Sequence, residues 1–359
     1  MTALTICGSS ASSSLQSVTS VTVQEQPTGD FSIGVGYSSL NQANFTLGIN
    51  ERNFLGTGRR LKMAFSTSGE DTDFTIGLTE PYFMGRDLNG SFDIFTRKDK
   101  SGDSAVHESG LSFGVGFAAA RDVYHRLRYD LSKSKTSVSS TTATSETGEE
   151  GKSLFGSSVA YTLSKDSRDS RFDPTEGYFL ELDETFSGLG GDVKFMRTKL
   201  SAAYYKPLLF KSVVVGLSGE VGHISGLGDK VTQSKRFYLG GRTIRGFDGA
   251  GIGPRDAGSG DSVGGNSMYS GRVEVLSNLG LNKDTGVRWT VFSDFGSLWG
   301  TDYPTNVTEA DANDLRASLG LGFYWSTAIG PLSFSWASPI SKMDHDKTRT
   351  FQFNIGTRL

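Results

Sequence analysis

The sequence predicts an all-β protein, a 16-stranded antiparallel transmembrane β-barrel of an outer membrane with one long loop folded into its lumen. Three observations predict it: the composition, the alternation of apolar and polar residues, and the lengths of the connections. The chain of 359 residues has 46 glycines, 8 prolines and 11 % aromatic residues, which disfavours helices and suits strands with glycines at bends. No stretch is long and apolar enough for a membrane-spanning helix. A barrel wall with alternating faces needs no such stretch.

Alternation with a period of two residues recurs along the chain. In "RLKMAFS", for example, Leu61, Met63 and Phe65 share one face, and the residues between them lie on the other. Such patterns predict half-buried strands whose apolar face meets either a core or lipid. The expected strands are 30–38, 43–52, 59–68, 72–80, 88–98, 107–119, 122–134, 154–165, 177–187, 192–206, 211–224, 266–277, 286–298, 313–326, 331–338 and 349–358.

The connections between these segments favour a membrane barrel over a soluble sandwich. Short connections alternate with long polar ones, and this is typical of outer-membrane barrels, which have short turns on one rim and long loops on the other. A sandwich would need a dense shared core, but many of the segments have a wholly polar second face. The short connections are 119–122, 206–211 and 328–331, and the long ones are 132–152, 225–265, 300–314 and 338–348.

Composition and motifs argue against several classes of function. The net charge of −3 gives no electrostatic reason to expect a nucleic-acid partner. The single cysteine, Cys7, supplies neither a disulfide framework nor a cysteine-based zinc site. The four histidines lack metal-ligand spacing, and no G-x-S-x-G or P-loop motif is present. We therefore expect no catalytic residue, no metal and no cofactor, and a protein that is not an enzyme.

One loop motif does not fit a solvent-exposed loop. In "GGRTIRGF" (240–247), a charged residue stands between two large apolar ones, which would be wasted in water. We interpret the glycines as letting the backbone fold inward, and the apolar residues as seating it; the alternative is a solvated loop charge. The motif residues are Gly240, Gly241, Ile244, Arg245, Gly246 and Phe247.

The two strands after this loop offer partners for its arginine. In "SMYSGRVEVLS" the apolar set faces lipid, which places Arg272 and Glu274 in the lumen. The same argument on "VRWTVFSDFGSLW" places Asp294 in the lumen. Because a guanidinium binds carboxylates strongly away from bulk water, we predict that Glu274 and Asp294 hold Arg245 inside the barrel.

A second charged stretch, "KDSRDSRFDPTEGY" (165–178), precedes a tight turn at 174–177. Proline, glycine and acidic residues in this order are typical of turns. We interpret it as a structural hairpin on the short-turn rim; a binding role is the alternative.

The motif "LGGRTIRGF" resembles the (V/I)RGF loop motif of the BamA family of outer-membrane protein insertases, also called the bacterial surface antigen family. Other segments resemble the family in the family's order, from about residue 20 to the end: "NFLGTGRRLKM", "EPYFMGRD", "FDPTEGY", "VGGNSM", "FSDFGSLW", "IGPLSFSWASPI" and "FQFNIGTRL". The resemblance implies a 16-stranded barrel whose sixth outer loop enters the lumen. It also implies that the motif arginine contacts the acidic residues aligned with Glu274 and Asp294.

The resemblance further implies a lateral gate between the first and last strands, 30–38 and 350–359, at which client barrels add strands. The physical basis is strand addition at an exposed edge, and glycines in the first strand should weaken its pairing. The implied gate residues are Phe31, Ile33, Gly34, Val35, Gly36, Phe351, Phe353 and Ile355.

These observations predict three parts of the chain: a disordered N-terminal remnant (1–19), the tail of a last POTRA domain (20–29) and the barrel (30–359). In the family, tandem POTRA domains receive clients and bind accessory assembly lipoproteins, so the resemblance does not imply independent insertase activity for this stretch. The chain ends in Leu359, where the family usually ends in an aromatic residue.

The expected partners are the lipid bilayer of a Gram-negative outer membrane, client β-barrel proteins and, where POTRA domains are present, accessory lipoproteins. Two alternatives remain. One is a relative that assists autotransporter assembly or two-partner secretion; the other is a passive porin in which the long loop constricts a channel.

Overall fold

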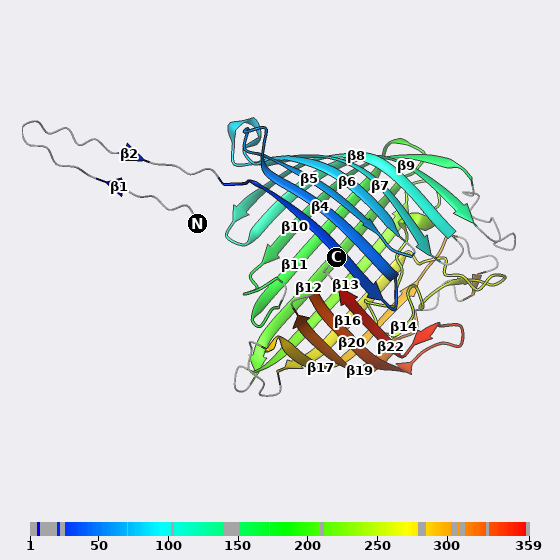
Figure 1. Cartoon of the computed structure of the whole chain (residues 1–359). Helices are drawn as coiled ribbons and strands as arrows, with labels where there is room; N and C mark the ends of the chain where they lie inside the picture. Colours follow the sequence, from blue (N-terminus) through cyan, green and yellow to red (C-terminus); the bar gives the residue numbers. More distant parts are fainter. Residues whose placement is uncertain are drawn as a thin grey trace, which may run out of the picture.

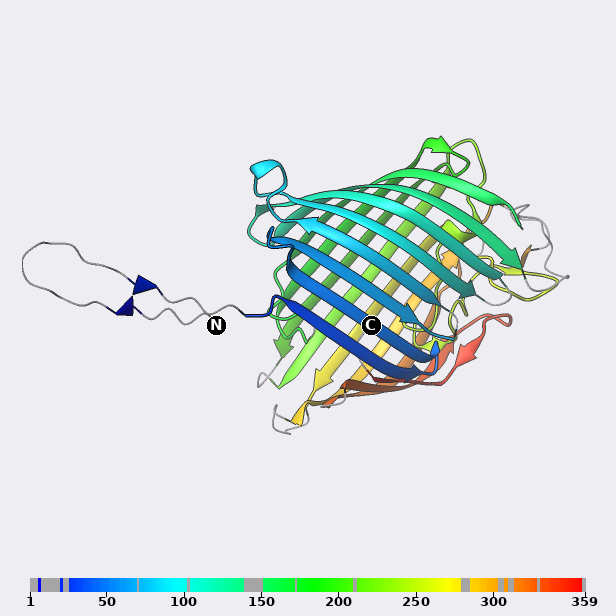
Figure 2. The same ribbon diagram turned by 45° about the horizontal axis from the view of Figure 1, so that its top comes forward.

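The protein is a closed barrel of 16 antiparallel strands (Figure 1 and Figure 2). The structure, a computed structural model, describes residues 6–7, 20–21, 26–69, 71–101, 104–138, 151–171, 173–208, 212–278, 285–302, 307–308, 313–327 and 330–356. Its wall strands are β3 (Gly29–Ser38), β4 (Gln42–Phe54), β5 (Arg59–Thr67), β6 (Thr72–Glu80), β7 (Asn89–Ser101), β8 (Ser104–Ala120), β9 (Val123–Val138), β10 (Ser153–Asp166), β11 (Gly177–Gly191), β12 (Phe195–Leu208), β13 (Val213–Gly226), β16 (Ser267–Ser277), β17 (Val287–Trp299), β19 (Arg316–Thr327), β20 (Gly330–Ser341) and β22 (Phe351–Gly356).

Each expected strand overlaps one strand of the wall, so the predicted fold class is confirmed. Several strands are longer than expected; β9, for example, extends to Val138 rather than to 134. A hydrogen-bonded hairpin needs no apolar face once it projects beyond the membrane, so the hydrophobic pattern underestimates its length. The last segment differs most, because the expected strand 349–358 is divided at Thr350 into β21 (Thr348–Arg349) and β22.

The two faces of the wall follow the period of two. Outward apolar side chains such as Leu217, Val221, Leu319 and Leu321 are exposed in the isolated chain, as a lipid-facing surface requires. The residues described include no helix that is long and apolar enough to cross a membrane.

The two rims differ in their loops. We call the rim where β3 begins the N-terminal rim and the opposite one the loop rim. The four long connections predicted all lie on the loop rim, but the expected alternation of lengths is wrong for the first half of the barrel. There the loop-rim connections 39–41, 68–71 and 102–103 are short as well. A tight turn suffices wherever adjacent antiparallel strands pair directly.

The N-terminal segment contains one short antiparallel pair, β1 (Ile6–Cys7) with β2 (Ser20–Val21). The other residues of the expected remnant (1–19), and residues 22–25 of the expected POTRA tail, lie outside the described part of the chain, as does Leu359. The domain boundaries proposed from the sequence therefore stay predictions.

Candidate functional site

The long connection between β13 and β16 folds into the barrel and builds a dry core there. Ile244, Phe247 and Ile252 of this lumen loop (residues 227–266) are fully buried. They pack with inward-facing residues of the wall, which explains why apolar residues flank a charge in the motif. The cluster comprises Val193, Phe195, Ile224, Val231, Phe237, Leu239, Ile244, Phe247, Ile252, Met268 and Leu298.

Asp294 on β17 holds the tip of the lumen loop. The Arg245 guanidinium donates from Nε to Asp294 Oδ2 and from Nη2 to Oδ1, both at 2.8 Å, and the Arg245 backbone N–H donates to Oδ2 at 3.0 Å. Asp294 is completely buried and Arg245 nearly so. A bidentate, charge-assisted pair of this kind fixes the orientation of the loop as well as its position.

A second guanidinium binds the same carboxylate. Arg272 on β16 lies directly opposite Asp294 on β17, and its Nε donates to Asp294 Oδ1 at 2.9 Å. Its Nη2 donates to the backbone carbonyl of Arg242 at 2.7 Å, which ties the wall to the loop again. Alternation in the sequence places Arg272 in the lumen but assigns it no role, because its register opposite Asp294 follows only from the pairing of β16 with β17.

Glu274 is a more distant partner than the sequence suggested. Its Oε2 lies 3.9 Å from Arg245 Nη2, which is an ion pair but not a hydrogen bond. The Arg245 guanidinium instead stacks on Phe292, with 3.2 Å between Cζ and the ring centroid, and its Nη1 lies 3.4 Å from the hydroxyl of Tyr324. Cation–π contact and a bidentate carboxylate together satisfy the buried charge.

The glycine next to the arginine permits a close approach to the wall. Gly246 has φ +94°, and a Cβ built there would lie 3.2 Å from Ser318 Cβ and 3.3 Å from Ala337 Cβ. Gly240 and Gly241 begin the turn that precedes it, and the Gly241 N–H donates to the Phe247 carbonyl at 3.1 Å. All six motif residues thus lie in one compact turn.

The lumen loop is also tied to the last loop of the barrel. Strand β14 (Gly246–Phe247) pairs with β21, and Gln352 Nε2 on β22 donates to the Phe247 carbonyl at 3.0 Å. Arg349 bridges the two regions, because its Nε pairs with Asp248 at 2.9 Å and its Nη1 donates to the carbonyl of Ser39 in the first hairpin. The loop therefore contacts both sides of the seam at which the barrel closes.

That seam, between β3 and β22, is short. In the described part of the chain it has three register pairs, Ser38 with Asn354, Tyr37 with Ile355 and Gly36 with Gly356, whereas β3 pairs with β4 over its whole length, from Gly29 to Ser38. Among the described residues, 29–35 of β3 have no partner on β22. Their outward side chains are strongly exposed: Phe31 is 64 %, Ile33 58 % and Val35 68 % exposed.

The predicted gate residues do not all lie at this seam. Ile355 and Gly36 belong to the paired end, and Gly34 lies on the unpaired part of β3. The structure places Phe351 against Trp336 of β20 instead, with 4.9 Å between the ring centroids. Phe353 stacks on Tyr37 at 5.7 Å and so touches the first strand through its side chain.

The charged turn 167–176 lies on the N-terminal rim between β10 and β11. Asp169 Oδ1 accepts hydrogen bonds from the backbone N–H groups of Ser170, Thr175 and Glu176 at 3.0, 2.8 and 3.2 Å, and Oδ2 accepts one from the Thr175 hydroxyl. Although burial acts to raise it, these hydrogen bonds hold the pKa of Asp169 below its usual range. The contacts are those of a structural turn.

Replacing Asp169 should therefore destabilise the barrel without touching the lumen. We expect Asp169→Ala to lower the free energy of unfolding by about 1–3 kcal/mol, because several donors lose their acceptor. The urea midpoint, followed by heat-modifiable gel mobility, measures this. Asp169→Asn keeps one carbonyl oxygen, so its urea midpoint should fall between those of the wild type and Asp169→Ala. Equal midpoints for Asp169→Ala and the wild type would contradict the structural role.

No group of three or more histidine, cysteine, aspartate or glutamate side chains that could hold a metal ion occurs in the described part of the chain. One carboxylate and two guanidinium groups fix the lumen loop to β16 and β17, and the loop in turn contacts β22 beside the short seam.

Fold and site together define an outer-membrane β-barrel whose lumen is occupied by one of its own loops. Residues 53–359 match the model of the Omp85 superfamily domain, and the chain belongs to this superfamily. The resemblance seen in the sequence is thereby confirmed. The protein is located in the outer membrane of a Gram-negative bacterium.

Individual proteins are similar to this chain over most of its length. "Outer membrane protein assembly factor BamA" of Neorickettsia risticii is 29 % identical over 340 residues, which cover 93 % of this chain and 46 % of the relative. A crystal structure of BamA from Haemophilus ducreyi lacking POTRA domains 1–3 superposes with a TM-score of 0.87 at 24 % identity, covering 99 % of this chain and 75 % of that one. CdiB from Acinetobacter baumannii superposes with a TM-score of 0.61 at 14 % identity, covering 99 % and 65 %. The chain spans about half the length of the curated BamA proteins it matches.

Proposed function

We propose that the protein is an assembly factor that inserts β-barrel proteins into the outer membrane, and that the seam between β3 and β22 is its lateral gate. The observation that carries this proposal is the seam of three described pairs beside residues 29–35 of β3, which have no partner on β22 in the described part of the chain. An unpaired edge with exposed N–H and C=O groups is a template for another strand. A client strand would pair there, and the barrel wall would open without bond chemistry or an energy source.

The lumen loop supports this function by holding the seam from inside. Its contacts to Gln352 and, through Arg349, to Ser39 involve the last strand and the first hairpin together. The loop can therefore keep the barrel closed at the loop rim while the N-terminal end of β3 accepts a client. Accessory assembly lipoproteins would bind through POTRA domains where these precede the barrel.

A covalent lock across the seam tests the proposal. In a Cys7→Ser background, Tyr37→Cys with Ile355→Cys places two cysteines at directly opposite positions of β3 and β22. We expect oxidation to reduce client folding in proteoliposomes to the rate in lipid alone, and reduction of the disulfide to restore it, because a locked seam cannot admit a strand.

The matched control joins β3 to its permanent neighbour. Tyr37→Cys with Ala43→Cys bridges β3 and β4, which stay paired in any open state, and should leave client folding unchanged when oxidised. Unchanged client folding in the oxidised seam variant would refute the gate. Steady large ion conductance without client adducts would instead favour the passive porin.

A further inference from the structure

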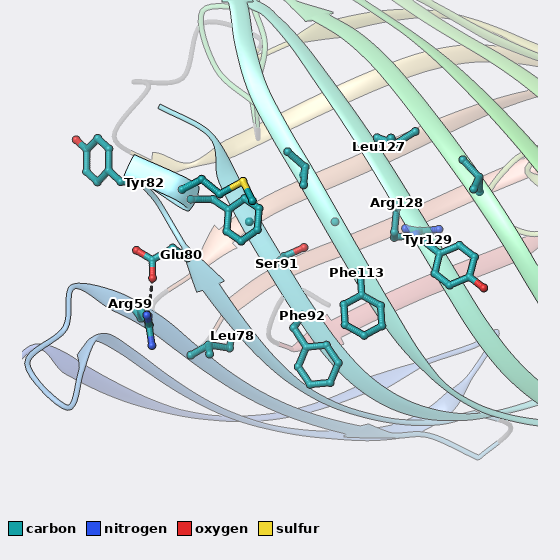
Figure 3. A pocket seen from close by; sticks show the side chains of 16 residues that line it. Arg59, Leu78, Glu80, Tyr82, Ser91, Phe92, Phe113, Leu127, Arg128 and Tyr129 are labelled. Carbon is teal, nitrogen blue, oxygen red and sulfur yellow. Dashed lines mark hydrogen bonds and ion pairs between the residues drawn. The ribbon is translucent and has the colours of Figure 1, made fainter. Parts of the chain in front are cut away.

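A groove of about 780 Å³ lies on the outer face of the wall near the N-terminal rim (Figure 3). It is formed mainly by outward side chains of β6 to β9, among them Leu78, Phe92, Phe113 and Leu127. Phe113 and Leu127 are exposed in the isolated chain, as lipid-facing residues are. The volume falls within the range of ordinary ligand sites, so this part of the wall is hollowed where a barrel surface is normally convex.

A short 3-10 helix closes the groove toward the rim. This helix, η1 (Phe83–Gly85), lies between β6 and β7 and turns back over the wall. Phe83 lies directly over Gly90 of β7, where an added Cβ would come within 2.6 Å of its ring. Met84 is 82 % exposed beside it. The helix thus adds an apolar lip to a groove that is continuous with the lipid-facing wall (Figure 3).

An ion pair stands at the edge of the groove on the same outward face. Arg59 at the start of β5 donates from Nε to Glu80 at the end of β6 (Figure 3). Charged side chains on the lipid face are tolerated near the interfaces rather than at the midplane, and these two lie at the rim end of their strands. They present one positive and one negative group next to the apolar groove.

We propose that this groove binds one phospholipid of the periplasmic leaflet that carries an ethanolamine headgroup. An acyl chain lies along the apolar lining under Phe83, the phosphate accepts hydrogen bonds from the Arg59 guanidinium, and the ammonium donates to Glu80. The headgroup carries one negative and one positive group, so its phosphate complements the charge of Arg59 and its ammonium complements the charge of Glu80. The N-terminal rim is the periplasmic one because the long loops lie on the other rim, and that leaflet consists of phospholipid. The inference depends on the location of the barrel, not on insertase activity.

Native mass spectrometry of the refolded protein tests it, with dioleoylphosphatidylethanolamine added to detergent micelles. Wild-type protein should retain one lipid after the micelle is removed. Val115→Trp fills the groove, and we expect it to lower lipid retention about tenfold. Phe83→Ala removes the lip from an element outside the wall strands, so it should leave the barrel folded and lower retention as well. Heat-modifiable gel mobility checks that each variant is folded.

Leu208→Trp is the matched control, because Leu208 is an exposed residue at the end of β12 on the same rim, away from the groove. Equal lipid retention by Val115→Trp, Phe83→Ala and Leu208→Trp would overturn the site. Arg59→Gln should weaken binding of the ethanolamine lipid about tenfold. Unchanged affinity in Arg59→Gln, or equal wild-type affinity for dioleoylphosphatidylglycerol, would overturn the headgroup assignment.

Discussion

Replacing Asp294 by alanine should release the tip of the lumen loop from the wall and remove a large part of the stability of the barrel. The change leaves Arg245 buried without the carboxylate that accepts its hydrogen bonds, and it removes the carboxylate acceptor of Arg272. Breaking a buried ion pair by removing one partner costs about 3–5 kcal/mol, against a total stability of roughly 5–15 kcal/mol for a folded domain. Heat-modifiable gel mobility and the urea midpoint of the refolded protein measure the loss.

The neighbouring strand offers a matched control. Glu274→Gln removes a carboxylate that lies 3.9 Å from Arg245 and makes an ion pair but no hydrogen bond with it. We expect its effect to be less than half that of Asp294→Ala. Comparable losses for the two variants would mean that the carboxylates share the arginine equally, and full heat-modifiable mobility for Asp294→Ala would refute the pinned loop.

The second large effect is expected at the seam. Gly356 has φ +126°, and a Cβ built there would collide with Gly36 Cα across the seam. Gly356→Ala should therefore break at least one of the three pairs that close the barrel. Backbone strain of this kind costs about 1–3 kcal/mol, so the ratio of the closed to the open population should fall about tenfold. The yield of a disulfide between cysteines replacing Ser38 and Asn354, in a Cys7→Ser background, reports that population.

Gly249→Ala serves as the control for this substitution. Gly249 lies in the lumen loop, and a Cβ added there would meet nothing within 4 Å. In the Gly249→Ala variant, the yield of the disulfide between cysteines at positions 38 and 354 should equal the yield without that substitution. If Gly356→Ala also gives the parent yield, the seam tolerates a side chain at its end, and the close approach of the two glycines does not limit closure.

The sequence predicted which side chains of the candidate site point into the lumen, but not the distances between their charged groups. Alternation placed Arg272, Glu274 and Asp294 in the lumen, because side chains on a strand alternate between two faces whatever the rest of the chain does. It did not show that Asp294 binds two guanidinium groups while Glu274 stays 3.9 Å away. That difference depends on how far the loop enters the barrel.

Contacts between distant segments lay beyond the sequence altogether. The pairing of β14 with β21 joins two loops, and the buried ion pair of Arg316 with Asp346 joins the start of β19 to the last loop. The loop residues that make these contacts lie in polar segments without the alternation of apolar and polar residues that predicts a strand. The length of the seam was equally hidden, because β22 was expected to continue to 358 and its described pairs with β3 end at Gly356.

By itself, the sequence determined the class of fold, the number of strands and which side of the wall each strand residue faces. These follow from a local rule, the period of two residues along a strand, which a hydrophobic pattern records directly. Only the tertiary structure decided how the barrel closes, which carboxylate holds the lumen loop, and where the outer wall is hollowed. Those features depend on register and curvature summed around the whole barrel, which no single segment encodes.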